Sequence, residues 1–227
     1  MSKRLPTRGD HLRAAIAQEA ARLMAEHGIQ DYGVAKRKAA ERYGVFDGPV
    51  LPRNVEIEAA LAAYQRLFGG REHEENLRRL RKVAVKAMRL LTAFEPRLVG
   101  SVLSGTATAH SDVELHVFSD SPEAVCIALM DRGVLYQATQ KAVKLQADRN
   151  TVVVPGLRFS VDAQAVDAAV FPSNGKRQAP LSPVDGKPMR RAGLDDVLNS
   201  ANTPRTSQIG TNAHPASPTG HGDSKLR

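Results

Sequence analysis

The sequence predicts an α+β protein in which an N-terminal helical region precedes a mixed sheet of about four strands with flanking helices. Three observations support this fold class. Apolar residues recur at helical spacing as far as Phe94. Beyond Phe94, short segments alternate between polar and apolar residues, as half-buried strands do. With 227 residues and a hydrophobic content of 42%, the chain is long and apolar enough to bury a sizeable core.

The same patterns divide the chain into three parts, which we expect to be a helical region (1–93), a sheet-containing domain (94–198) and a disordered tail (199–227). The tail is rich in Ser, Thr, Pro, Gly and Asn and poor in apolar residues. Before residue 94, apolar periodicity and glycine stops predict helices over 11–27, 34–43, 55–68 and 72–94. After it, we expect strands over 96–99, 112–118, 134–146 and 151–166, with a turn at 148–150 and one helix between Ser121 and Gly133.

Composition and charge bound the class of protein. One cysteine, Cys126, excludes an intramolecular disulfide and fits a reducing cytoplasm. No apolar run reaches the length of a membrane span and no apolar centre of a signal peptide follows the basic N-terminus, so we expect a cytoplasmic protein with no membrane partner. The net charge of +8 is uneven, at +7 over residues 1–100, −3 over 101–171 and +4 over 172–227. An acidic centre between basic flanks suits a metal-bound nucleotide beside a polyanion, although solubility explains the same charges.

The stretch from Leu98 to Phe118 carries the strongest chemical signal. Its last seven residues alternate, so Asp112, Glu114 and His116 share one face of a strand and the apolar residues take the other. Two neighbouring carboxylates repel each other, and a hard divalent cation such as Mg²⁺ is the commonest reason for placing them together. Imidazole is a poor ligand for Mg²⁺, so we assign His116 to ordinary hydrogen bonding.

Val99-Gly100-Ser101, a spacer of ten residues and Asp112-Val113-Glu114-Leu115 resemble the motif of the DNA polymerase β-like nucleotidyltransferases. That motif is a hydrophobic residue, Gly-Ser, a spacer and two acidic residues separated by one hydrophobic residue. The form here is similar to that of small bacterial members, and it departs from the commonest pattern by having Glu114 in place of Asp. The resemblance covers about residues 94–171.

The resemblance implies a metal-dependent nucleotidyltransferase, which transfers a nucleoside monophosphate from a nucleoside triphosphate, with ATP expected, to an unknown acceptor and releases pyrophosphate. Asp112, Glu114 and a third carboxylate, Asp162, would be the catalytic residues and hold Mg²⁺ or Mn²⁺. Asp167 is the competing candidate for the third carboxylate. The nucleotide would be bound by Gly100, Ser101 and Lys144, of which Lys144 is one of several basic candidates for the phosphates.

A second hypothesis is a catalytically inactive protein of the same fold that acts as a nucleic-acid-binding or regulatory module. Its partner would be nucleic acid, bound through basic N-terminal helices. One predicted helix carries a basic row at spacings of three and four residues, for which a solvated surface is the simpler explanation. The residues of that row are Arg78, Lys82, Lys86 and Arg89.

Overall fold

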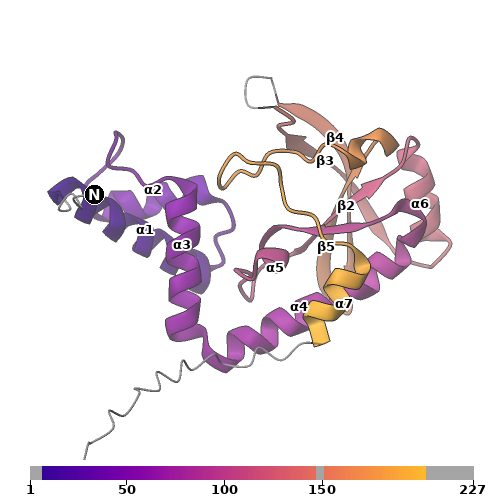
Figure 1. The fold of residues 1–227 in the computed structure, drawn as a ribbon, viewed down its shortest axis with the longest axis horizontal. Helices are drawn as coiled ribbons and strands as arrows, with labels where there is room; N and C mark the ends of the chain where they lie inside the picture. Colours follow the sequence, from indigo (N-terminus) through magenta and orange to yellow (C-terminus); the bar gives the residue numbers. More distant parts are fainter. Residues whose placement is uncertain (1–6, 147–150, 203–227) are drawn as a thin grey trace, which may run out of the picture.

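The computed structural model describes residues 7–146 and 151–202 and shows a mixed α+β architecture (Figure 1). The strands are β1 (Arg97–Val99), β2 (Val113–Phe118), β3 (Tyr136–Val143), β4 (Val152–Val161) and β5 (Gln164–Phe171). They form one sheet in the order β1-β2-β5-β4-β3. β2 and β5 run parallel and the other neighbouring pairs are antiparallel, so the sheet is mixed, as predicted.

The helices confirm the predicted change from helical to extended structure near Phe94. The α-helices are α1 (Arg8–His27), α2 (Tyr32–Arg42), α3 (Asn54–Tyr64), α4 (Gly70–Leu90), α5 (Gly100–Ser104), α6 (Pro122–Met130) and α7 (Leu194–Asn202). Three short helical segments, η1 (Gln65–Gly69), η2 (Thr92–Phe94) and η3 (Ser173–Lys176), complete the described elements. Within the described part of the chain, no helix combines the length and the hydrophobicity needed to cross a membrane.

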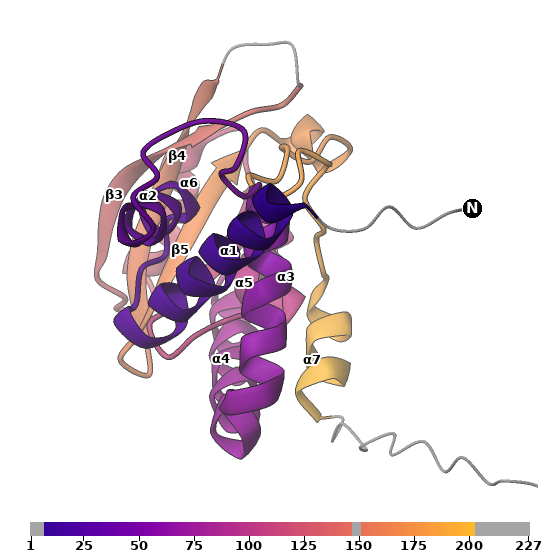
Figure 2. The same ribbon diagram turned by 90° about the vertical axis from the view of Figure 1, so that its left-hand side faces the viewer.

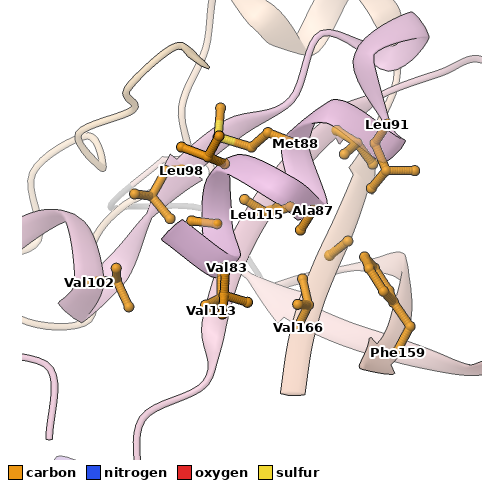
Figure 3. Close-up of a cluster of buried hydrophobic side chains, with 14 of the residues drawn as sticks. Val83, Ala87, Met88, Leu91, Leu98, Val102, Val113, Leu115, Phe159 and Val166 are labelled. Carbon is orange, nitrogen blue, oxygen red and sulfur yellow. The ribbon is translucent and has the colours of Figure 1, made fainter. Parts of the chain in front are cut away.

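One face of the sheet forms the main hydrophobic core beneath α4, α6 and α7. The alternation of β2 places Val113 and Leu115 in this core, and Val166 of β5 lies beside them. Figure 3 shows Val83 and Met88 of α4 packed over these strands. Each such buried aliphatic side chain contributes about 1.5–3 kcal/mol. The opposite face of the sheet, called the open face below, is therefore the one on which β2 can present polar side chains.

The sheet has five strands where about four were expected, because the predicted strand over 151–166 is a hairpin. Asp162 and Ala163 have backbone φ angles of 50° and 61° and form a two-residue turn between β4 and β5. A turn of this kind requires positive φ at both central residues and matches the twist of the flanking strands. The chain therefore reverses at Asp162, and the period-2 pattern restarts on the other side of the turn.

Helices α1–α3 enclose a second hydrophobic cluster of their own, which includes Ile16, Met24, Ile57 and Leu61. α4, although it lies within residues 1–93, packs with the sheet. The predicted domain boundary at residue 93 stays a prediction. Residues 203–227 of the predicted tail and the predicted turn at 148–150 lie outside the described residues, and α7 extends to Asn202.

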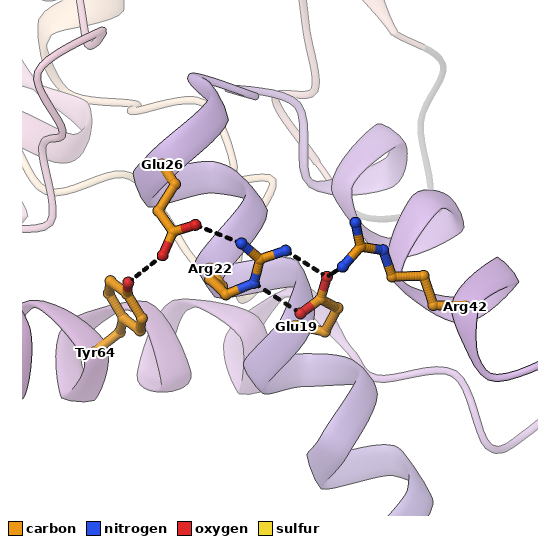
Figure 4. Close-up of polar contacts among 5 residues, drawn as sticks. All are labelled: Glu19, Arg22, Glu26, Arg42 and Tyr64. Atoms are coloured by element: carbon orange, nitrogen blue, oxygen red, sulfur yellow. Dashed lines mark hydrogen bonds and ion pairs between the residues drawn. The ribbon is translucent and has the colours of Figure 1, made fainter.

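Ion pairs and hydrogen bonds fix the three N-terminal helices to one another (Figure 4). Arg22 of α1 contacts both Glu19 and Glu26, and Arg42 of α2 also pairs with Glu19, at 2.6 Å. Tyr64 of α3 donates a hydrogen bond to Glu26. Helices α1–α3, called the helical region from here on, thus have their own hydrophobic core and their own network of ion pairs and hydrogen bonds.

Polar contacts place this helical region over the open face of the sheet (Figure 2). The buried Gln65 side chain donates to the carbonyl oxygens of Thr106, at 2.8 Å, and Ala107, at 3.3 Å. Asn54 donates to the carbonyl oxygen of Pro183 at 2.8 Å. These bonds join the helices to the loop after α5 and to the C-terminal segment.

Arg191 anchors the C-terminal segment against the open face of the sheet. Its Nε donates to Nδ1 of the buried His116 at 3.0 Å, and Nη1 donates to the carbonyl oxygen of Gly175 at 3.0 Å. The guanidinium group lies 5.0 Å and 5.4 Å from the ring centroids of Phe118 and Phe171. Burial and the neighbouring guanidinium charge lower the pKa of His116 to about 3.

We predict that His116 makes the stability of the protein fall with pH below neutrality. Between pH 6.5 and about 3 the unfolded state binds a proton on this imidazole that the folded state does not bind. From pH 7 to pH 5 this linkage removes about 2 kcal/mol from the free energy of unfolding. His116→Asn keeps an acceptor for Arg191 without titrating, so denaturant unfolding should show a pH dependence that is weaker by that amount. Parallel pH profiles for the two proteins would contradict the assignment.

Candidate functional site

A row of polar residues crosses the open face of the sheet. Glu114 of β2 is the register neighbour of Asp167 of β5, and Asp167 is the register neighbour of Arg158 of β4. Each neighbour in a sheet row lies about 5 Å away and shares the same face. The strand register alone therefore places two acidic residues and one arginine side by side.

This row forms the floor of a cavity of about 590 Å³. Asp112, just before β2, and Gly100 and Ser101, at the start of α5, also line it. Its remaining walls come from the N-terminal helical region, including Tyr32 and Glu58, and from residues 182–190 of the C-terminal segment. A cavity of this size is typical of a site for a small molecule or cofactor.

Gly100 is required by the position of Glu114. Its φ of +69° lies in the left-handed region, which favours glycine. A Cβ atom at this position would lie 1.7 Å from Oε2 of Glu114. Burial raises the pKa of Glu114; the positive charge of Lys141 opposes this effect, and the negative charges of Asp167 and Asp112 add to it. The Glu114 side chain faces the cavity and is exposed within it, and the surrounding protein atoms raise its pKa.

Two cations of the chain itself pair with the other carboxylates. Arg158 contacts Oδ2 of Asp112 at 2.9 Å, and the ammonium group of Lys141 contacts Oδ2 of Asp167. Asp167 Oδ1 is buried and has no hydrogen-bond partner among the described residues. Glu114 forms no ion pair within the same part of the chain.

The donor set fits a hard divalent cation, since carboxylate oxygens are the ligands that Mg²⁺ prefers and one of these oxygens is buried without a partner among the residues described. Across residues 7–146 and 151–202, however, no three His, Cys, Asp or Glu side chains are arranged so as to hold a metal ion. Asp112 and Asp167 are instead turned to Arg158 and Lys141.

The structure brings Asp112, Glu114, Gly100 and Ser101 together at this cavity, but it does not place Asp162 with them. Asp162 lies in the turn between β4 and β5 and pairs with Lys86 of α4 at 2.7 Å. The structure therefore does not bring Asp162 to the two carboxylates it was expected to join, because the strand expected to carry it ends there. Asp167, the competing candidate, occupies the position beside Glu114.

The structure does not bring Lys144 to the cavity either. It follows the end of β3, is exposed and does not line the cavity, whereas Lys141 does. Gln137 of β3 pairs with Arg158, so odd-numbered residues of β3 face the cavity and the parity of Lys144 is the opposite one. Alternation along the predicted strand places the two lysines on opposite faces, and the register with Arg158 shows that Lys141 is on the side of the cavity.

Sequence reasoning missed Glu58 and Tyr32, which the helical region contributes to the cavity wall. Glu58 accepts hydrogen bonds from the hydroxyl group of Tyr32 and, at 2.8 Å, from Thr106 Oγ1. Burial and the Glu58 carboxylate raise the pKa of Tyr32. No local pattern marks these residues, because the contact with Thr106 joins positions more than forty residues apart along the chain.

Comparisons with known proteins add little to this geometry. No family model matches the chain, and no curated protein matches it. A similar solved structure is described as "Structural Basis for the Activity of a Cytoplasmic RNA Terminal U-transferase", with a TM-score of 0.29 and 22% sequence identity. The match covers 44% of this chain and 29% of that chain, so this chain spans less than a third of that protein's length. At this level, the similarity carries no argument about function.

Gly100→Ala should displace the Glu114 carboxylate more than it disturbs the fold. The left-handed φ costs about 1–2 kcal/mol for a residue with a Cβ atom, and the collision falls on the far end of a flexible side chain. We expect a ¹³C NMR titration to show the raised pKa of Glu114 returning toward its ordinary value in this variant.

Gly44→Ala is the matched control, because Gly44 has a φ of +66° and a Cβ atom there would meet no other atom within 4 Å among the described residues. It should lose similar stability and leave the pKa of Glu114 raised. An unchanged Glu114 titration in Gly100→Ala would show that the glycine does not set the position of this carboxylate.

Proposed function

We propose that this protein is a metal-dependent nucleotidyltransferase, which transfers a nucleoside monophosphate from a nucleoside triphosphate to an acceptor and releases pyrophosphate. The observation that carries the proposal is the convergence of Asp112, Glu114 and Asp167 on one cavity that also contains the start of α5. The motif resemblance around Gly100-Ser101 and Asp112-x-Glu114 supports it. Asp167 takes the role that the sequence had given to Asp162.

The roles of the residues follow from where they lie. Asp112, Glu114 and Asp167 would hold Mg²⁺ or Mn²⁺, which when bound neutralises negative charge on the reacting phosphate and its leaving group. The hydroxyl and amide groups of Ser101, at the cavity wall, would donate hydrogen bonds to phosphate oxygens. Because little covalent work is asked of the protein in phosphoryl chemistry, positioning and charge are its main contribution.

The helical region would form the side of the cavity that faces the acceptor. Tyr32 and Glu58 line that wall opposite the carboxylate row, and their hydrogen bond fixes the orientation of both side chains. ATP is the triphosphate we expect at this site.

A second candidate function is a catalytically inactive nucleic-acid-binding module of the same fold. The observation that favours it is the set of exposed basic side chains on α4, including Arg78, Lys82 and Arg89. In that case the pairs Arg158–Asp112 and Lys141–Asp167 would be permanent structural ion pairs. Metal-dependent binding of a triphosphate separates the two functions.

Asp167→Asn should abolish the rise in thermal stability that metal and triphosphate cause together. For the wild-type protein, a ligand at a hundredfold excess over its Kd adds about 2.7 kcal/mol, or roughly 5–10 °C in Tm at this size. Losing one of three carboxylates should remove most of that rise. The measurement is a thermal unfolding series with each of the four triphosphates, with and without Mg²⁺ or Mn²⁺.

Asp162→Asn provides the control for this experiment, since it neutralises an acidic residue that lies outside the cavity. It should keep the full stabilisation. A wild-type protein that shows no metal-dependent response to any triphosphate would overturn the catalytic proposal and favour the binding module.

A further inference from the structure

Lys141 and Arg158 approach the carboxylates along the same face of the sheet. They belong to the antiparallel strands β3 and β4. Of the carboxylates, Asp112 directly precedes β2, Glu114 is in β2 and Asp167 is in β5. Both side chains line the same cavity as Gly100 and Ser101. Their side chains are 35% and 44% exposed, so each is partly open to a ligand in the cavity.

Gly156 allows Lys141 to extend across β4. It is buried and pairs in register with Thr139, two residues from Lys141 on the same face of β3. A Cβ atom at this position would lie 2.6 Å from Thr139 Oγ1 and 3.2 Å from Cγ of Lys141. Without that atom, the lysine stem passes over β4 and its ammonium group meets Asp167 on β5.

We propose that Lys141 and Arg158 are the triphosphate-binding cations of this cavity and that Asp167 and Asp112 hold them until a divalent cation takes over these carboxylates. This inference rests on the proposed function. It goes beyond it by assigning two phosphate-binding residues and a coupling between the two ligands.

The charges of the cavity favour this exchange. Lys141 and Arg158 together carry two positive charges, which is the charge that one divalent cation brings to the carboxylates. Metal binding therefore replaces the charge that neutralises Asp112 and Asp167 and leaves two cations for a polyanion. A guanidinium group and an ammonium group are the side chains that bind phosphate oxygens most strongly.

The exchange makes metal and triphosphate bind cooperatively. Each ligand removes a competitor of the other, since the metal displaces the cations from the carboxylates and the triphosphate draws them away. By thermodynamic linkage, the factor by which metal tightens triphosphate binding equals the factor by which triphosphate tightens metal binding.

The first test is Lys141→Gln, with Lys176→Gln as its matched control. Lys176 also pairs with a carboxylate, that of Glu95, but does not line the cavity. In Lys141→Gln, calorimetric titration with a non-hydrolysable ATP analogue and Mg²⁺ should give binding about tenfold or more weaker than wild type. Titration with Mn²⁺ alone, followed by electron paramagnetic resonance, should give tighter binding, because the competitor for Asp167 is gone. Arg158→Gln should show the same two opposite shifts.

The second test uses binding of the same analogue in the presence of EDTA. Asp167→Asn releases Lys141 without any metal, so metal-free binding of the analogue should become several-fold to tenfold tighter than in wild type. Glu114→Gln removes an equal charge from the cavity but frees no paired cation, so it reports the general electrostatic effect. The gain in Asp167→Asn should exceed the gain in Glu114→Gln and disappear in the double variant Lys141→Gln/Asp167→Asn.

The outcomes separate this inference from the function on which it rests. If wild type binds the analogue with Mg²⁺ and Lys141→Gln and Arg158→Gln bind it equally well, the exchange is wrong and the proposed function stands. The exchange is also wrong if both variants bind Mn²⁺ more weakly, since the ion pairs would then only support the site. Absence of Mg²⁺-dependent binding by wild type would overturn both.

Discussion

The structure depends on the adjacency of Glu114 and Asp167 on two parallel strands of one sheet. Like charges at neighbouring positions of a sheet repel, and partial burial strengthens that repulsion because the surroundings screen it less. Other residues of the open face compensate for this repulsion. Lys141 and Arg158 supply opposite charge from β3 and β4, and Gly100 leaves room for the Glu114 carboxylate.

The sequence predicts the parts of this arrangement that depend on local patterns. Alternation placed Asp112 and Glu114 at one strand, and the helical periodicity ended near Phe94, where the structure begins its sheet. It could not predict which later carboxylate joins them, because that choice depends on a turn at Asp162 that reverses the chain. An Asp-Ala pair is not a strong turn signal, whereas Asn-Gly or Asp-Gly would have been. Lys144 was named for the phosphates for a related reason, since the face of the strand that meets the carboxylates is fixed by the register with Arg158.

The cavity walls were beyond sequence reasoning for a different physical reason. Helices α1–α3 have a separate hydrophobic cluster, so their own periodicity explains their fold without reference to the sheet. What places them over the carboxylates is a few long-range polar contacts, such as Gln65 with the Thr106 carbonyl and Asn54 with the Pro183 carbonyl. Contacts of this kind leave no periodic signal in the sequence, although they give the site its enclosure.

Structural ion pairs alone do not account for this cavity. The Arg158–Asp112 ion pair is partly exposed, and an exposed ion pair contributes only about 0–1 kcal/mol to the free energy of unfolding. A purely structural role also leaves Asp167 Oδ1 buried without a partner among the described residues, at a cost of about 1–3 kcal/mol. A Cβ atom at Gly100 would displace the Glu114 carboxylate, and a Cβ atom at Gly156 would crowd the Thr139 hydroxyl group and the stem of Lys141. These features follow together if the carboxylates and cations exist to exchange partners with a metal ion and a phosphate chain, because a site that must change partners cannot satisfy every polar atom in its resting state.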